Sequence, residues 1–333
     1  MHAPTHRRSA LLFALAAVCS IGTAPLAQAQ APGSDYPNKP ITLVVPYPAG
    51  GANDAVARLV GQKMAELLKQ PIIIDNKPGA GTTIGTAQVA KAPADGYTLV
   101  LGSLASHAVA PHLYGKPGYH AIDDFAPIGT IGLAPIVLVV AKDSPYADLK
   151  AVVAAAKAKP DTLTYGSSGN GSPLHLAGEL FKQAAKIQVT HVPYKGGNAH
   201  TMDLIGGRLD MILDTATSAV PLIKGDKVRP LAVAASSRMA EFPNTPTFAE
   251  AGFPGFEVSA WYALYAPAKT PKAVVDRLNA ELAAALKSPD VSDKLKNLGV
   301  TPASGSTDDL ARFTKTEYER YGKVMREGNI RID

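Results

Sequence analysis

The sequence predicts an α/β protein of two lobes, each a mostly parallel sheet flanked by helices, joined by two extended crossover strands. Short β-rich runs alternate with helical stretches in two successive sets, which is typical of chains that build parallel sheets. Two extended apolar stretches separate these sets. Apolar residues make up 46% of the 333 residues, which is ample for two hydrophobic cores.

The first thirty residues have the three parts of a secretory signal. Arg7 and Arg8 give a positive start, residues 10–18 form a short apolar run, and Ala27-Gln28-Ala29 fits a small-x-small cleavage site. We therefore expect residues 1–29 to be a signal peptide that is cleaved after Ala29. The apolar run is too short to cross a bilayer, which needs ~20 residues. Export by the Sec or the twin-arginine route stays open.

Composition excludes several classes of partner and chemistry. Removing residues 1–29 takes away two of the 33 basic residues and no acidic residue, which lowers the net charge from +5 to +3. The single cysteine, Cys19, leaves with the signal, so the mature chain has no disulfide and no thiol chemistry. Cys19 also raises the alternative of a lipoprotein, but Val18 before it is bulkier than lipoprotein processing usually accepts. Basic residues are scattered singly, so we expect no nucleic-acid partner.

The first set of elements shows a βαβαβ rhythm. The helix expected over residues 55–68 carries apolar residues at helical spacing. Strands are expected at residues 41–46, 71–75 and 97–101, and helices at 55–68, 82–90 and 106–113.

An apolar stretch at residues 128–141 passes through Pro135 without a helix start, and we interpret it as a crossing between lobes. Residues 253–267 are again extended and aromatic, and we interpret them as the return crossing. Between the crossings, helices are expected at 148–157, 173–185, 199–205 and 218–224, and strands at 162–165, 188–192, 209–214 and 229–235.

Two helices are expected to close the chain. One begins at Thr270-Pro271 and the other at Ser306, with Asp309 completing its start. The two crossings imply a discontinuous first lobe, residues 30–132 plus 256–333, and a second lobe, residues 133–255. Lobes joined by two strands can move as on a hinge, and ligand sites prefer such interfaces.

Glycine-rich turns, rather than charged side chains, carry the expected chemistry. The loop at residues 46–54 precedes a helix, where free backbone N–H groups and the helix dipole favour an anion. Such a nest holds a carboxylate or phosphate without lysine or arginine. Similar loops occupy residues 77–83, 165–173 and 191–197. Asp214 ends a strand, where it either caps the next helix or accepts a hydrogen bond from a ligand amine or hydroxyl.

Other functional motifs fail on spacing. Gly79 to Gly85 has one residue too many for a dinucleotide fingerprint, and no P-loop is present. Asn170 stands where a nucleophile elbow needs glycine, although Ser168, or Ser172 with His175, leaves a secreted serine hydrolase as an alternative. The histidines lack metal-ligand spacing. We therefore expect no metal, no cofactor and no catalytic residues.

At this point the order of motifs resembles a known family. The stretches YPNKPITLVVPYPAGGANDAVARL, NKPGAGTTIGTAQVAKAPADGYTLVLGS, YGSSGNGSPLHLAGELF, HVPYKGG and GRLDMILD follow in order, and RPLAVAASSR and PTFAEAGFPGFEVSAWYALYAPAKTP match near the end. Together they are similar to the Bug-type periplasmic solute receptors of tripartite tricarboxylate transporters. The resemblance covers nearly the whole mature chain.

The resemblance implies a two-lobed periplasmic-binding-protein fold that closes on a small organic acid. It implies that backbone amides and ordered water hold a ligand carboxylate. Carried over to this chain, the ligand-binding residues are Tyr47, Ala49, Gly50, Gly51, Asn53, Ser103, Ser167, Ser168, Gly169, Ser172, Tyr194 and Asp214.

The expected function is that of a monomeric, non-enzymatic receptor in the periplasm that delivers its ligand to membrane permease subunits. Asp214 would suit an amine or hydroxyl at the distal end of the ligand, and would repel a second carboxylate unless water intervened. Dicarboxylates and tricarboxylates, hydroxy acids, amino acids and aromatic acids all stay open. A ligand sensor for a membrane kinase is the alternative outside transport.

Overall fold

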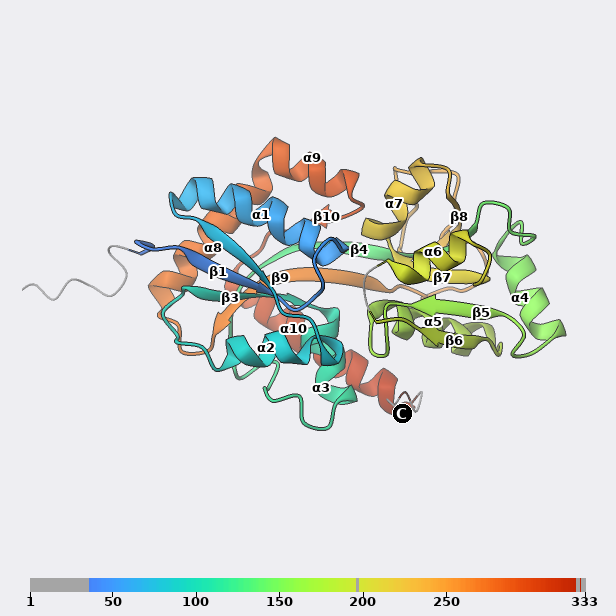
Figure 1. Cartoon of the computed structure of the whole chain (residues 1–333), viewed down its shortest axis with the longest axis horizontal. Helices are drawn as coiled ribbons and strands as arrows, with labels where there is room; N and C mark the ends of the chain where they lie inside the picture. Colours follow the sequence, from blue (N-terminus) through green and yellow to red (C-terminus); the bar gives the residue numbers. More distant parts are fainter. Residues whose placement is uncertain (1–35, 196–197, 328–329, 331–333) are drawn as a thin grey trace, which may run out of the picture.

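A computed structural model describes residues 36–195, 198–327 and 330. The predicted signal peptide, residues 1–29, and the two glycines after Lys195 lie outside the described residues. The chain forms two lobes that lie side by side, with two long strands running from one to the other (Figure 1). Among the described residues, no helix is long and apolar enough to cross a membrane.

The first lobe is built on a sheet whose parallel part comes from the predicted βαβαβ unit. The strand order is β2-β1-β3-β9-β4, in which β1 is parallel to β2 and β3, and β9 runs antiparallel to both of its neighbours. The elements are β1 (Ile41–Val45), α1 (Ala52–Leu68), β2 (Ile72–Asn76), a 3-10 turn (Ala80–Thr82), α2 (Thr83–Ala90), β3 (Thr98–Ser103), a π-helical turn (Ala105–Val109) and α3 (Ala110–Leu113).

The second lobe holds the predicted insert. Its sheet has the order β4-β7-β5-β6, with β8 also paired to β4, and β5 is parallel to β6 and β7. The elements are α4 (Leu149–Ala158), β5 (Thr164–Ser167), α5 (Pro173–Ala185), β6 (Thr190–Pro193), α6 (Ala199–Ile205), β7 (Met211–Thr215), α7 (Ala216–Lys224) and β8 (Val228–Val233).

Both predicted crossings are present as long strands. Strand β4 (Phe125–Ala141) pairs with β9 (Ser259–Pro267) from Phe125 to Pro135, and then with β7 of the second lobe from Ile136 onward. The change of sheet falls at Pro135, which has no N–H to give to a ladder. Ile136 N donates to Val258 O at 2.9 Å just beyond the end of β9.

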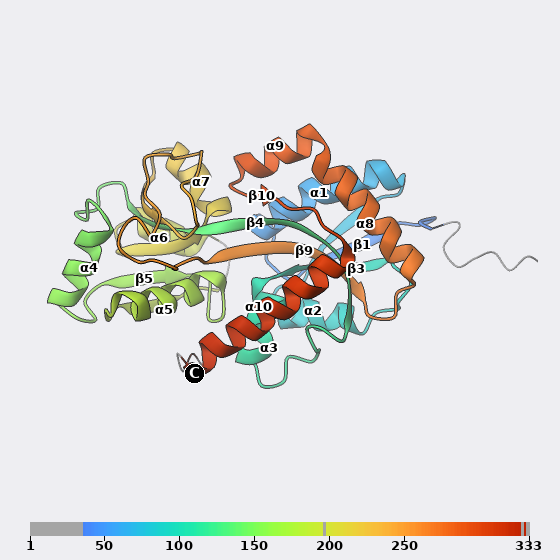
Figure 2. The same ribbon diagram turned by 180° about the vertical axis from the view of Figure 1, so that it is seen from behind.

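The end of the chain differs from the expectation of two helices. It contains α8 (Lys272–Lys287), α9 (Pro289–Asn297), the two-residue strand β10 (Thr301–Pro302) and α10 (Thr307–Glu327), which crosses the back of the sheet (Figure 2). Helix α9 escaped prediction because it is short and polar, with two buried residues, Val291 and Leu295. Ser306 and Asp309 cap α10 as predicted, by reciprocal backbone-to-side-chain hydrogen bonds of 2.8 and 3.1 Å.

Apolar packing behind β3 and β9 also joins the lobes. Leu176 of α5 belongs to the same buried cluster as Val109, Trp261 and Met325 of the first lobe. Next to this cluster, a Cβ placed on Gly171 would lie 2.4 Å from Leu113 Cδ2, which shows how closely the second lobe approaches α3. The two lobes are therefore in contact around this apolar cluster.

Gly102 of β3 provides a test of this packing. A Cβ at this position would lie 2.3 Å from the Tyr265 ring and 2.9 Å from the His107 ring, and both rings are buried. Gly102→Ala is therefore expected to lower the free energy of unfolding by about 1–3 kcal/mol, measured by urea denaturation. Gly115→Ala is the matched control, because a Cβ there meets nothing within 4 Å. Equal stability of the two variants would contradict the packing described here.

Candidate functional site

A cavity of about 470 Å³ lies between the lobes. Its first wall comes from the glycine-rich loops of the first lobe, its second wall from those of the second lobe, and its floor from β9. The first-lobe lining is Pro46, Tyr47, Pro48, Gly51, Ala52, Asn53, Pro78, Gly79, Ala80, Gly81, Thr82, Ser103, Leu104, Ala105 and Tyr114. The rest is Ser168, Gly169, Asn170, Gly171, Ser172, Pro173, Leu174, Tyr194, Lys195, Asn198, His200, Asp214, Thr215, Ser218, Ala260, Trp261 and Tyr262.

The start of α1 faces this cavity, and the helix begins at Ala52, three residues before the expected start at Ala55. Gly51 is the N-cap and no side chain caps the helix, while Ala52 and Asn53 follow it along the wall. The helix dipole therefore places partial positive charge at the cavity. Ala49 and Gly50 do not line it, contrary to expectation, because the Gly50 N–H turns away and donates to Asp54 Oδ2 at 2.9 Å.

The Asp54 carboxylate that takes the Gly50 N–H is itself fully bonded. It accepts hydrogen bonds from Arg58 Nε at 2.9 Å and from Asn76 Nδ2 at 3.0 Å. Although burial opposes ionisation, the bonds from Arg58, Gly50 and Asn76 hold the pKa of Asp54 below its usual range. This carboxylate stabilises the loop before α1 and does not line the cavity.

A chain of hydroxyl groups ends at the first-lobe wall. Tyr47 OH lies 2.7 Å from Ser103 Oγ, Ser103 Oγ lies 3.3 Å from Ser106 Oγ, and Ser106 Oγ lies 2.8 Å from His107 Nδ1. Burial lowers the pKa of His107 to about 3, so its ring is neutral. Tyr47 and Ser103, both predicted to bind the ligand, line the cavity.

The direction in which these hydrogen-bonded groups donate favours an anionic ligand. The Nε2 atom of His107 has no partner among the described residues, and an unpaired lone pair is less costly than an unpaired N–H. The proton is therefore expected on Nδ1, which then donates to Ser106 Oγ. The Ser106 hydroxyl can then donate a hydrogen bond to Ser103 Oγ. This leaves the hydroxyl of Ser103 or of Tyr47 free to donate a hydrogen bond into the cavity.

The loop before α2 is strained where it lines the cavity. Four successive residues, Gly79, Ala80, Gly81 and Thr82, have positive φ between 43° and 134°. For Thr82 at φ 84° this conformation is unfavourable, because a β-branched side chain crowds the backbone there. Strain of this kind concentrates at functional sites. The Thr82 hydroxyl is buried without a partner among the described residues.

In the second lobe, the loop before α5 is held by two histidines. Ser167 Oγ lies 2.7 Å from His191 Nε2, and Gly171 N donates to His175 Nδ1 at 3.2 Å. Ser168, Gly169 and Ser172 line the cavity, but Ser167 does not, because its hydroxyl faces His191 and Gly169.

Ser172 and His175 are placed as a helix cap and not as a catalytic pair. Ser172 Oγ accepts from His175 N at 3.2 Å, and its own proton stays free to donate toward the cavity. The imidazole Nδ1 of His175 is occupied by Gly171, so this ring atom cannot act as the base for Ser172.

Tyr194 lines the cavity, but its hydroxyl does not donate into it as predicted. The hydroxyl donates to Asp203 Oδ2 at 2.5 Å, and that carboxylate is also paired with Arg208. The hydroxyl bonds Asp203, one helical turn into α6, because a charged carboxylate is a stronger hydrogen-bond acceptor than water. Tyr194 therefore contributes its ring to the wall.

Asp214 lies at the end of β7, where the sequence predicted it, and His200 lies opposite it. Asp214 Oδ1 accepts from Thr215 N at 2.7 Å, while Thr215 caps α7. His200 Nε2 lies 3.8 Å from Asp214 Oδ2, and both residues line the cavity. His200 was not predicted from the sequence. A histidine in the first turn of a helix that follows a glycine-rich loop was the available signal.

Buried polar atoms without partners converge on this cavity. Of the eight such side-chain atoms among the described residues, five belong to cavity-lining residues. Native proteins leave few buried polar groups unpaired, so such a cluster marks where a ligand or ordered water binds. These five atoms are Asn53 Oδ1, Thr82 Oγ1, His200 Nδ1, His200 Nε2 and Asp214 Oδ2.

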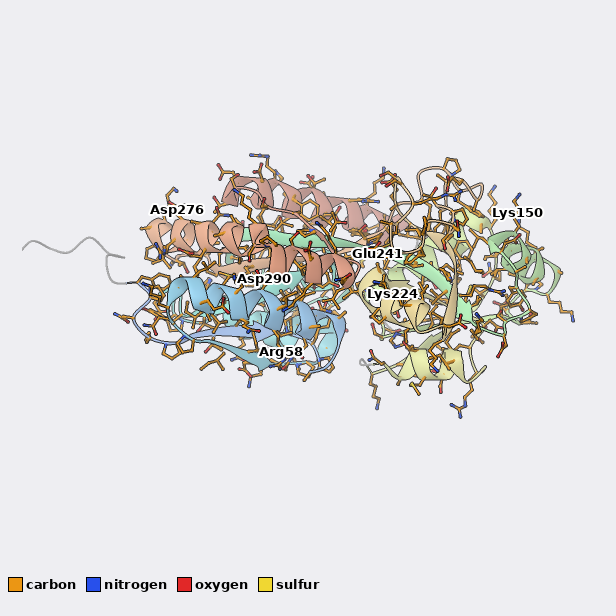
Figure 3. All side chains as sticks on the ribbon, turned by 90° about the horizontal axis from the view of Figure 1, so that it is seen from above. Arg58, Lys150, Lys224, Glu241, Asp276 and Asp290 are labelled. Atoms are coloured by element: carbon orange, nitrogen blue, oxygen red, sulfur yellow. The ribbon has the colours of Figure 1, made fainter. Side chains whose placement is uncertain are left out.

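The described lining carries one cation, Lys195, and one carboxylate, Asp214. Arg58 on α1 and Lys150 at the far end of the second lobe lie instead on the outer surface (Figure 3). Within the described part of the chain, no three His, Cys, Asp or Glu side chains are grouped so that they could hold a metal. The cavity therefore offers helix dipoles, hydroxyls and one His–Asp pair.

Stability is expected to depend on pH through the buried histidines. Burial lowers the pKa of His175, lowers that of His191 to about 4 and that of His107 to about 3. The unfolded chain then binds more protons than the folded chain as the pH falls below about 6.5. The free energy of unfolding should be level above that pH and should fall as the pH goes from about 6.5 to 4.

The measurement is urea denaturation across this pH range. In His191→Gln the fall should be shallower, because one histidine no longer takes up a proton on unfolding. Gly115→Ala, which keeps every histidine and adds a Cβ with nothing within 4 Å, should keep the slope of the unmodified protein. Equal slopes in all three proteins would show that the histidines do not carry the pH dependence.

Comparison with known proteins agrees with this geometry. The family model described as "Tripartite tricarboxylate transporter family receptor" matches residues 56–330. The chain is 34% identical to protein BugT of Bordetella pertussis over 94% of this chain and 96% of that one. Two solved Rhodopseudomonas palustris proteins are also similar. Rpa4515 with adipate has a TM-score of 0.85 and 37% identity, with 89% and 99% of the chains covered.

The second of these structures is MatC with bound malate. It has a TM-score of 0.82 and 36% identity, and the match covers 87% of this chain and 99% of that one. The family consists of periplasmic solute-binding receptors, which are not enzymes, so the hydrolase interpretation is set aside. The fold, the cavity between the lobes and these matches together place the chain in the tripartite tricarboxylate transporter receptor family, among its Bug-type members.

Proposed function

We propose that this receptor binds a small carboxylated compound in the cavity between its lobes and delivers it to the permease subunits of a tripartite tricarboxylate-type transporter. The observation that carries the proposal is the cluster of five unpartnered polar atoms in a cavity with little charge. Such a set needs a polar ligand, or ordered water, to complete its hydrogen bonds. The adipate and malate of the two Rhodopseudomonas palustris structures are carboxylates of this kind.

The ligand carboxylate lies against the first lobe in this proposal. The start of α1 supplies backbone N–H groups at Ala52 and Asn53, and Tyr47 or Ser103 supplies a hydroxyl proton. Low local dielectric strengthens these bonds, so an anion is held without lysine or arginine. Ser168, Gly169 and Ser172 contact the ligand from the second lobe.

Closure of the lobes accompanies binding. The moving units are residues 30–132 plus 256–333 and residues 133–255, joined where β4 and β9 pass between them. A ligand that touches both walls favours the closed arrangement by its contacts to each. The close approach of Gly171 to Leu113 supports the closed form as the one described above.

The mature protein is expected in the periplasm as a monomer that begins at Gln30. Native mass spectrometry of protein purified from that compartment should show a chain lacking residues 1–29, with a co-purified small acid. Denaturing mass spectrometry of the same sample gives the chain without its ligand. A chain that keeps residues 1–29, or that carries no acid after gentle purification, would contradict this part of the proposal.

Tyr47→Phe tests the first-lobe site. The variant lacks the hydroxyl at the cavity end of the hydrogen-bonded groups that lead to His107. Its affinity for the co-purified acid, measured by calorimetry, should therefore fall about 10-fold. Tyr97→Phe is the matched control, because its hydroxyl bonds Asn38 outside the cavity. Unchanged affinity in Tyr47→Phe would show that the carboxylate lies elsewhere.

The same variant separates transport from sensing in cells. Uptake of the radiolabelled acid should fall in cells that carry Tyr47→Phe and should stay normal in cells that carry Tyr97→Phe. A protein that reports ligand to a membrane kinase would instead change gene expression and leave uptake at limiting acid concentration intact.

A further inference from the structure

We infer that His200 and Asp214 form a specificity site for a hydroxyl group of the ligand, at the second-lobe end of the cavity. The receptor then prefers hydroxylated carboxylic acids over plain acids of the same carbon skeleton. This inference rests on the proposed function, because it assumes a carboxylate bound against the first lobe. It adds the chemical class that the second lobe selects.

The two side chains are buried and face each other at ion-pair distance, without a hydrogen bond between them. Their residues are 3% and 2% exposed, and His200 Nε2 lies 3.8 Å from Asp214 Oδ2, beyond hydrogen-bond distance. The other oxygen, Oδ1, is held by Thr215 N at 2.7 Å, which fixes the orientation of the carboxylate. The pair is thus positioned by β7 and by α6, and both residues line the cavity.

Three atoms of this pair have no partner among the described residues: Asp214 Oδ2 and both ring nitrogens of His200. A carboxylate accepts hydrogen bonds and donates none, while a neutral imidazole has one donor and one acceptor. A ligand oxygen about 2.8 Å from both Nε2 and Oδ2 would see them at an angle of about 85°, which suits one accepted and one donated bond. A hydroxyl group has this combination.

Competing ligand groups fit less well. An ionised carboxylate cannot donate to Asp214, and it would meet a like charge at close range in a low dielectric. An ammonium group can donate to both residues, but then His200 Nε2 must be the acceptor and the proton must lie on Nδ1. That would leave a buried N–H without a partner, which costs more than the unpaired Nδ1 lone pair left by a hydroxyl.

A purely structural role for the pair is unfavourable. The Cβ of His200 packs over Gly166 of β5, at 3.3 Å from the position of a Cβ there, so an apolar side chain at 200 could fill the same space. It would avoid two unpaired ring nitrogens, and an apolar residue at 214 would avoid an unpaired carboxylate oxygen. A ligand hydroxyl gives these atoms partners, whereas packing alone does not.

The test is calorimetry with the mature protein, freed of ligand by unfolding and refolding. Three sets of acids share a skeleton: succinate, malate and aspartate; butyrate, 4-hydroxybutyrate and 4-aminobutyrate; benzoate, 4-hydroxybenzoate and 4-aminobenzoate. In the set that binds most tightly, the hydroxy acid should bind about 10- to 100-fold more tightly than the plain acid. Asp214→Asn and His200→Gln should each reduce that ratio to less than about 3-fold. Lys150→Gln, at the far end of the second lobe, should leave the ratio unchanged.

The outcomes separate this inference from the proposed function. If plain and hydroxylated acids bind equally, or if both variants keep the full ratio while circular dichroism shows them folded, the hydroxyl site is wrong and the carboxylate receptor stands. Preference for the amino compound assigns the site to an ammonium group and overturns the inference. If no acid of any set binds and none co-purifies with the protein, the proposed function fails together with the inference.

Discussion

The antiparallel pairing of β4 with β9 is the constraint on which the rest of the structure depends. Over residues 125–135 of β4 and 259–267 of β9, the two strands form one ladder of the first lobe. Beyond Pro135 the same β4 continues into the sheet of the second lobe. Because both connections between lobes pass through this ladder, the glycine-rich loops at the strand ends face each other across one cavity.

That arrangement explains how a site with little charge can hold an anion. The start of α1 brings helix dipole and free N–H groups to one wall, and the hydroxyl chain from His107 to Tyr47 adds an oriented donor. A neutral His107 is essential here, and its burial against Phe125 and Tyr265 keeps it so. The low fraction of charged residues in the sequence is thus consistent with a site made of backbone dipoles and hydroxyls.

The second lobe has a different chemical character. Its loop before α5 is held by His175 and His191, and the bond that His175 Nδ1 accepts from Gly171 N persists only while that ring nitrogen is unprotonated. Asp214 brings the one carboxylate of the described lining, and His200 faces it. In the proposed function and the further inference, the first lobe therefore binds a feature common to all acids, and the second lobe distinguishes one acid from another.

The sequence alone determined most of the elements, although not α9 or β10, and it determined the loops, because hydrophobic periodicity and turn residues act over a few neighbouring positions. Helices α5 and α6 have their predicted bounds, and Tyr47, Gly51, Asn53, Ser103 and Asp214 line the cavity. Tertiary structure decided which atoms of those loops face a ligand. Asp54 accepts the hydrogen bond of the Gly50 N–H, and Asp203 accepts that of the Tyr194 hydroxyl, so neither donor is left for a ligand. His200 of α6 lies opposite Asp214 of β7. Competition between hydrogen-bond partners and long-range packing settles such choices, and no local pattern encodes them.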